Sequence, residues 1–297
     1  MTAAMRNTSP AQDALPGVNA PLRHPGPAAE ARVQAVATTL REIEITCDGE
    51  ASLEAAVIAA FDGAGLKGGF VEIENLACSC IDYVVPALSE FPDRLAWYSA
   101  PRSPQGPARI RQGYMSVGRD GEAGFVHCHG IWMLANGRRA LGHLLGGQTV
   151  PEAGQTLRAW GFETAVFDRQ PDAETNFSLF GAVGEDAARP TALAVTLRPN
   201  EDIPASCMAL CEQMGWDGAT VIGLGSLNGA GFAGDSIMQD HVSEFLVRRG
   251  YVSPTHADID IAVVDSSANV FEGILAPGQG RVSITSELVL LARPLED

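Results

Sequence analysis

Lysine and long apolar runs are scarce in this sequence, and its few cysteines lack the spacing of a disulfide or metal framework. Of 297 residues, six are cysteine and one, Lys67, is lysine. No C-x-x-C pair occurs, so reduced thiols in the cytoplasm are expected. The longest apolar stretches, such as 288–292, fall far short of the ~18 residues that a membrane span needs. The first thirty residues carry no apolar secretory core. We therefore expect a cytoplasmic protein with no membrane partner.

Positive charge is also scarce. The chain has 20 basic and 36 acidic residues, a formal net charge of −16 at pH 7. Coating DNA requires clustered Lys and Arg to neutralise phosphates, so DNA is not expected as a partner. The hydrophobic share of 46% is that of a globular protein and excludes global disorder.

Two stretches of the chain share one pattern of elements. Residues 45–71 and 195–221 both read as strand, turn, helix, glycine-containing turn and strand. The helices place apolar residues three and four positions apart and end near glycines suited to a left-handed C-cap, Gly63 or Gly65 and Gly215. We interpret this as two tandem copies of one α/β unit; chance similarity between two unrelated α/β halves is the alternative.

This interpretation divides the chain into three parts. Residues 1–31 are rich in Ala and Pro and are expected to form a flexible or arm-like segment. Residues 32–168 form the first predicted domain, and residues 173–297 form the second.

The clearest chemical pattern is His127-x-His129, followed by His143. Phe125 to Ile131 reads as a strand, so its alternation places His127 and His129 on one face. Two such imidazoles can chelate a divalent metal, and His143, after a turn, would complete a three-histidine set with an open position. The alternative is a pair of strand histidines satisfied by ordinary hydrogen bonds.

Arginines are concentrated near these histidines. Between Arg94 and Arg139 there are seven arginines and two acidic residues. An excess of arginine beside a metal would attract a carboxylate or phosphate. Arg109 and Arg111 alternate on a predicted strand leading toward His127, so they are the preferred ligand-binding candidates; solvated loop arginines are the alternative.

The second half lacks the histidines. Aligned with its counterpart, it has Asp258, Asp260 and Ile274 in their places, and Glu287 where the first half has Thr156. Two carboxylates without a third ligand make a weak transition-metal site. The second copy is therefore predicted to be mainly structural, or to contribute carboxylates to an interface site.

These motifs resemble a known family. His127-Cys128-His129, Asn136-Gly137 and Gly142-His143-Leu144-Leu145 are similar to the histidine signature of the plant-and-prokaryote-conserved domain, also called DUF296. The resemblance implies a compact α/β (α+β) domain with a mixed, largely antiparallel sheet and packed helices, which forms homotrimers. It also implies a divalent metal, zinc first, on His127, His129 and His143. Plant members bind DNA through a basic hook that this chain lacks.

The leading hypothesis is a metal-dependent protein that binds or acts on a small anionic metabolite. As an enzyme it would be a lyase, hydratase or hydrolase, although the sequence does not decide whether it is one. The alternatives are a non-catalytic ligand sensor or scaffold and, less favoured, a DNA-associated regulator. Because each chain carries two predicted units, three chains would form two stacked rings of three units, a homotrimer.

Overall fold

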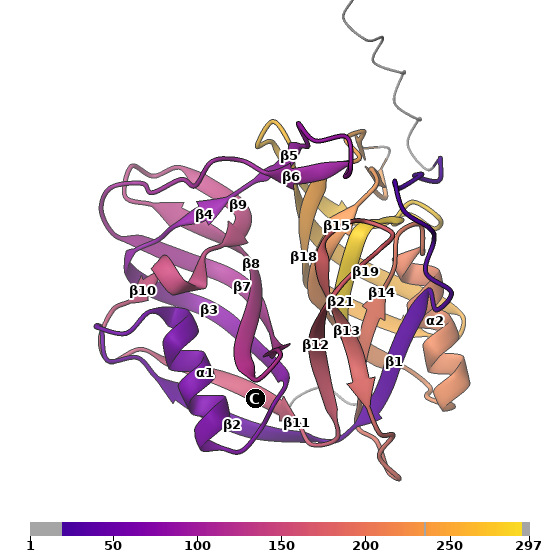
Figure 1. Ribbon diagram of the computed structural model, residues 1–297, viewed down its shortest axis with the longest axis horizontal. Coiled ribbons are helices and arrows are strands. Elements are labelled where there is room, and N and C mark those ends of the chain that lie inside the picture. The colour runs from indigo at the N-terminus through magenta and orange to yellow at the C-terminus, as the bar shows by residue number, and fades with distance from the viewer. Residues whose placement is uncertain (1–19, 235, 293–297) are drawn as a thin grey trace, which may run out of the picture.

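Two β-sheets face each other, and each carries one α-helix on its outer side (Figure 1). The computed structural model describes residues 20–234 and 236–292. The helix α1 (Leu53–Gly63) covers the first sheet, and α2 (Ile203–Met214) covers the second. The space between the sheets is filled by residues of both, such as Phe70 and Tyr114 from the first and Leu224 and Val289 from the second. The described part of the molecule is thus a four-layer stack.

Both sheets are built almost wholly from antiparallel neighbours. The first runs in the order β2 (Leu40–Thr46), β11 (Thr156–Phe162), β3 (Gly69–Cys80), β7 (Ala108–Asp120), β8 (Ala123–Leu134), β9 (Arg139–Leu144) and β4 (Tyr83–Val84). The short β10 (Val150–Pro151) pairs with β3, and β12 (Ala165–Pro171) joins β7 and β13 (Ser178–Gly184). The second runs in the order β1 (Val33–Thr38), β14 (Ala192–Leu197), β21 (Val282–Leu291), β15 (Ala219–Leu227), β18 (Ser243–Ser253), β19 (His256–Asp265) and β20 (Val270–Ile274).

Smaller elements lie at the ends of these sheets. They are the hairpins β5 (Pro86–Leu88) with β6 (Ala96–Tyr98) and β16 (Ala230–Gly231) with β17 (Ile237–Met238), and the single-turn helix η1 (Gly146–Gln148). No helix in the described ranges is long and apolar enough to cross a membrane.

Both predicted helices begin at a residue whose side chain caps the helix N-terminus. Ser52 caps α1 by accepting the Ala55 backbone N–H, and Asp202 caps α2 in the same way through Ala205. Gly215 ends α2 with a φ of 64°, a left-handed conformation that costs glycine no steric penalty. The sequence prediction of these two helices is therefore confirmed.

The fold is richer in β-structure than the predicted α/β class. Strands account for 54% of the described residues and helices for 10%. Short strands such as β5 and β6 add to this content, and β12 (Ala165–Pro171) runs through the predicted domain boundary after residue 168. The largely antiparallel character of the sheets agrees with the prediction.

The two sheets share one connection pattern. The order β2–β11–β3–β7–β8–β9 in the first matches β14–β21–β15–β18–β19–β20 in the second, and each helix joins the first strand of its sheet to the third in that order. The cross-strand pairs also correspond, since His129 lies opposite His143 and Asp260 lies opposite Ile274. Two copies of one unit would produce this pattern.

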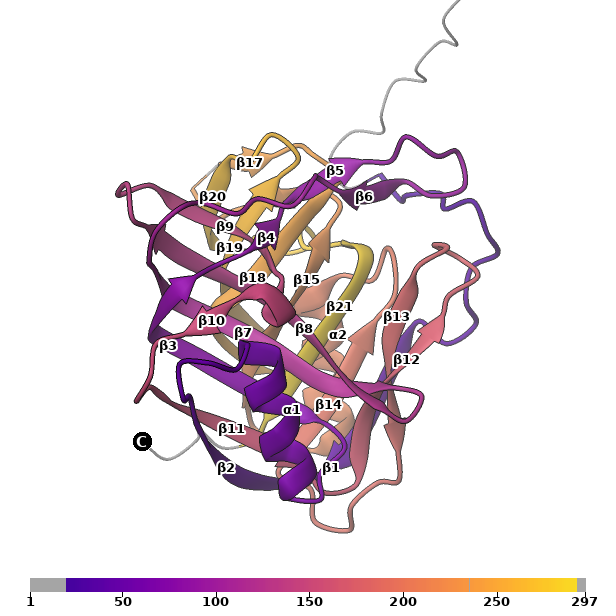
Figure 2. The same cartoon turned by 60° about the vertical axis from the view of Figure 1, so that its left-hand side comes forward.

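Strands pass between the halves. Although β1 falls within the range predicted for the first domain, it pairs with β14 at the edge of the second sheet. The first sheet in turn extends through β12, parallel to β7, to β13. The two halves of the chain are therefore interlocked, as Figure 2 shows from the side of α1.

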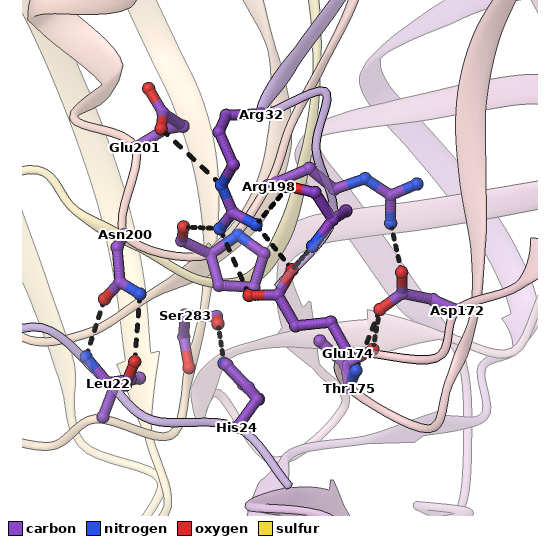
Figure 3. A network of polar contacts seen from close by, with 12 residues as sticks. Leu22, His24, Arg32, Asp172, Glu174, Thr175, Arg198, Asn200, Glu201 and Ser283 are labelled. Carbon is purple, nitrogen blue, oxygen red and sulfur yellow. Dashed lines mark hydrogen bonds and ion pairs between the residues drawn. The ribbon is translucent and has the colours of Figure 1, made fainter. Parts of the chain in front are cut away.

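The described part of the N-terminal segment lies across the second half of the chain. Leu22 exchanges two hydrogen bonds with the Asn200 side chain, and His24 contacts the Ser283 carbonyl oxygen through Nε2 at 2.9 Å (Figure 3). Gly26 donates its N–H to the Glu174 carbonyl. Residues 20–32 thus form an arm that leads into β1, while the predicted flexibility of residues 1–19 concerns a stretch outside the described residues.

Candidate metal centre

The β8–β9 hairpin brings the three predicted histidines together. Antiparallel pairing places His129 directly opposite His143, and His127 lies two residues away on the same face of β8. A set of potential ligand atoms, one from each histidine, lies within 4.8 Å of one another. This face points toward the second sheet, because His129 contacts the Phe245 carbonyl on β18.

Two glutamates of the second sheet complete the site. Glu287 on β21 contacts His127, with 2.5 Å between Oε2 and Nδ1. Glu244 on β18 places Oε1 3.8 Å from both His129 Nε2 and His143 Nδ1. Both carboxylates are almost fully buried. The second half therefore contributes carboxylates to the histidine site, the interface role predicted as one option for Glu287; Glu244 had not been singled out.

Hydrogen bonding fixes which ring nitrogens are available. His129 Nδ1 lies 2.9 Å from a carbonyl oxygen, which can only accept, so this nitrogen carries the proton. His127 Nδ1 faces the Glu287 carboxylate in the same manner. When both rings are neutral, the two Nε2 atoms therefore present lone pairs to each other at 3.1 Å. Facing acceptors repel unless a cation lies between or beside them.

Burial keeps two of the three histidines in the neutral form that binds metal. It holds the pKa of His129 well below its ordinary value, and the neighbouring His127 and His143 lower it further. The pKa of His143 is lowered by burial and then by His127. Burial raises the pKa of Glu244 to about 8. Neutral imidazoles are the ligand form, so no proton has to leave these two rings for a metal to bind at neutral pH.

Several buried polar atoms here have no hydrogen-bond partner among the described residues. They include His143 Nδ1 and Glu244 Oε2, and also Thr285 Oγ1 nearby in the second sheet. Unsatisfied buried polar groups are costly and call for a ligand, ion or water. His143 Nδ1 lies 3.8 Å from Glu244 Oε1, so the unsatisfied atoms of these two residues are close together.

The histidines line a cavity of about 390 Å³ between the sheets. Besides the three histidines and two glutamates, its walls include Arg94, Trp97, Tyr98, Phe125, Arg169, Phe177, Phe180 and Thr285. Trp97 and Tyr98 both come from β6. Arg94 belonged to the arginine-rich stretch but was not preferred within it.

The preferred arginines do not reach this cavity. Arg109 pairs across the hairpin with Met133, whereas His127 pairs with Ser116 near the other end of β7. Arg109 donates to the Asn75 carbonyl at 2.7 Å and is exposed. Arg111 lines a separate, open hollow with Arg139 and Arg248. A β-bulge between Ile110 and Gln112 interrupts the alternation of β7, and distance along the strand separates both arginines from the histidines.

The matching positions of the second half form no such cluster. Asp260 is bound by Arg248 at 2.8 Å, and its cross-strand neighbour is Ile274. Among the described residues, His127, His129 and His143 are the group of metal-ligating side chains close enough to hold an ion.

Comparison with known proteins gives similarities of fold only. No family model matches the sequence, and no curated protein matches it. A metal-containing protein from Archaeoglobus fulgidus is 13% identical with a TM-score of 0.36, over 48% of this chain and 94% of its own. A plant- and prokaryote-conserved protein from Pyrococcus horikoshii is 13% identical with a TM-score of 0.34, over 52% of this chain and 99% of its own. A candidate DNA-binding protein from Bacteroides thetaiotaomicron is 12% identical with a TM-score of 0.37, over 48% of this chain and 91% of its own.

Proposed function

We propose that the chain holds a divalent metal ion on His127, His129 and His143, with zinc as the preferred ion, and uses it to bind or transform a small anionic metabolite. The carrying observation is the pair of Nε2 atoms that face each other at 3.1 Å while both Nδ1 atoms are engaged elsewhere. Three neutral imidazoles are a common ligand set of catalytic zinc sites. A bound ion would supply a Lewis acid able to polarise a carbonyl or activate water.

The surrounding residues have distinct roles in this proposal. Glu287 fixes the orientation and tautomer of His127, as carboxylates do behind metal-bound histidines. Glu244 lies beside two of the histidines and borders the cavity, where it can take up or release a proton of a bound molecule. An acid–base group at this place favours an enzyme, of the lyase, hydratase or hydrolase type, over a ligand sensor or scaffold.

Metal analysis of the purified protein tests the centre directly. We expect up to one divalent ion per chain, and its loss in His127→Ala/His129→Ala. His256→Ala is the matched control, because His256 is exposed on β19 and lies outside the cluster. Full retention of metal by the double variant would refute the proposal.

We also propose that the protein is a cytoplasmic homotrimer of these two-unit chains. The shared connection pattern of the two sheets supports two units per chain, and closed symmetry is usual for such assemblies. The six cysteines are all free, which agrees with a reducing compartment. Light scattering during size exclusion should give about three times the chain mass of 31.2 kDa; a monodisperse monomer or dimer would refute the assembly.

A further inference from the structure

We propose that the ligand of this cavity is a planar aromatic carboxylate that also carries an acceptor group for Arg169. The inference rests on the proposed metal centre and concerns the part of the cavity beyond the histidines. In this arrangement the carboxylate lies at the histidine end, the ring lies among aromatic side chains, and the second group meets the guanidinium.

The cavity walls beyond the metal ligands are aromatic. Trp97 packs against Phe177 with ring centroids 5.5 Å apart, and Phe125 meets Phe180 edge-on at 5.6 Å. All four line the cavity. Such faces and edges favour a flat conjugated ring over a saturated one of equal size, because ring quadrupoles add to simple apolar burial.

Each aromatic pair carries an arginine. The Arg94 guanidinium lies 4.7 Å from the Trp97 ring centre, and that of Arg169 lies 4.6 Å from the Phe125 ring centre. Arg94 commits Nε and Nη2 to Asp93. Arg169 binds Asp120 through Nη1 alone, which leaves further donors on a cavity-lining guanidinium. A stacked arginine with spare N–H groups is well suited to a planar carboxylate or carbonyl.

The polar residues of the wall do not change this character. Ser226 accepts the backbone N–H groups of Ile284 and Thr285, and Ser243 exchanges hydrogen bonds with Leu227. These hydroxyls are therefore committed to the second sheet. Thr285 Oγ1 is the exception: it is buried and has no partner within the described ranges. It can form a hydrogen bond with one polar group of the ligand. A purely apolar compound would leave this hydroxyl unsatisfied.

The wall that carries Phe177 is held in place before any ligand arrives. Asp172 donates its N–H to the Phe177 carbonyl at 2.7 Å and binds Arg198 through its side chain at 2.8 Å. Thr175 donates to Asp172 twice, and the N-terminal arm clamps Glu174 through Arg32 (Figure 3). A rigid wall favours a ligand of fixed shape, since little ordering has to accompany binding.

The size of the cavity suits a small ligand. About 390 Å³ lies near the lower end of the range for small-molecule sites. One ring with two short substituents fits this space, whereas a dinucleotide or a long acyl chain does not.

Matched probes test the class. With metal-loaded protein, calorimetry should show benzoate binding about tenfold more tightly than cyclohexanecarboxylate, which has the same charge and carbon count. Phe177→Leu should abolish this preference while the metal content stays unchanged. Phe91→Leu is the control, because Phe91 is exposed between β5 and β6 and does not line the cavity.

A second arm tests Arg169. The tighter of benzene-1,3- and benzene-1,4-dicarboxylate should exceed benzoate in affinity, and Arg169→Gln should remove most of that gain, about tenfold. Thermal melting of each variant establishes that it is folded. If the purified unmodified protein contained no metal, the proposed metal centre would be refuted. Full metal loading with equal affinity for both ring types, or with no binding at millimolar concentration, would overturn the present inference alone.

Discussion

Replacing Arg32 by alanine should destabilise the whole protein, although Arg32 lies outside both sheets. Its Nη1 lies 2.6 Å from Glu174 Oε2, and its Nη2 lies 3.2 Å from Oε1. The Glu174 side chain is only 5% exposed, against 25% for Arg32. The substitution therefore removes the better-exposed partner and leaves the buried charge behind.

The expected loss follows from this asymmetry. Breaking a buried ion pair by removing one partner costs about 3–5 kcal/mol. Glu174 would keep one donor, the Ala29 N–H at 3.0 Å, and Arg32 is partly solvated, so the lower end applies. We expect a loss of about 3 kcal/mol in the free energy of unfolding. Adding Glu174→Gln to Arg32→Ala should recover part of this loss, because the uncompensated charge disappears.

Urea unfolding followed by fluorescence measures the effect, with the slope of the transition compared among variants. Arg23→Ala is the matched control: Arg23 lies on the same arm but is exposed, so its loss should stay within about 0.5 kcal/mol. An Arg32→Ala variant as stable as this control would show that the arm contributes little to the fold, and the reasoning would fail.

Three further predictions concern metal, pH and DNA. Glu287→Gln should keep the ion but weaken zinc affinity about 10–100-fold in chelator competition; unchanged affinity would contradict the role given to this carboxylate. Arg139 and Arg248 hold the pKa of Glu272 below its usual value, so the unmodified protein should exceed Glu272→Gln in stability at pH 7. That advantage should fade as the pH falls from about 4.5 through the lower folded-state pKa, as acid titration of both proteins can check. Fluorescence anisotropy on random duplex DNA at ~0.15 M salt should show binding weaker than the usual ~10⁻⁴–10⁻⁶ M of non-specific binders; sub-micromolar binding would contradict this.

Local patterns in the sequence were sufficient to place the helices and the histidines. Ser52 and Gly215 act through neighbours a few residues away, and alternation along β8 determines which face His127 and His129 share. The correspondence between the two halves also predicts equal positions for His143 and Ile274, which the cross-strand pairs match. Such information lies within one strand or one hairpin.

Features that depend on the meeting of distant strands could not be predicted in this way. Nothing near Glu244 in the sequence indicates that β18 faces the β8–β9 hairpin, so this residue was missed. The crossing of β1 to the second sheet has no local signal either, since its residues would suit the edge of either sheet. Arg109 and Arg111 lie away from the histidine cavity, because alternation indicates neither a bulge nor a distance along a long strand.

The interlocking of the two halves has a consequence for how the protein folds. β1 pairs with β14, and β21 inserts between β14 and β15, so neighbours in the second sheet come from remote parts of the chain. Contacts between remote segments close slowly because the loop entropy is lost before the pairing energy is gained. Refolding should therefore be slow for this size, with the apolar edge of β14 open to other chains while it waits for its partners. Expression at high concentration then becomes a competition between completing this sheet and aggregating through it.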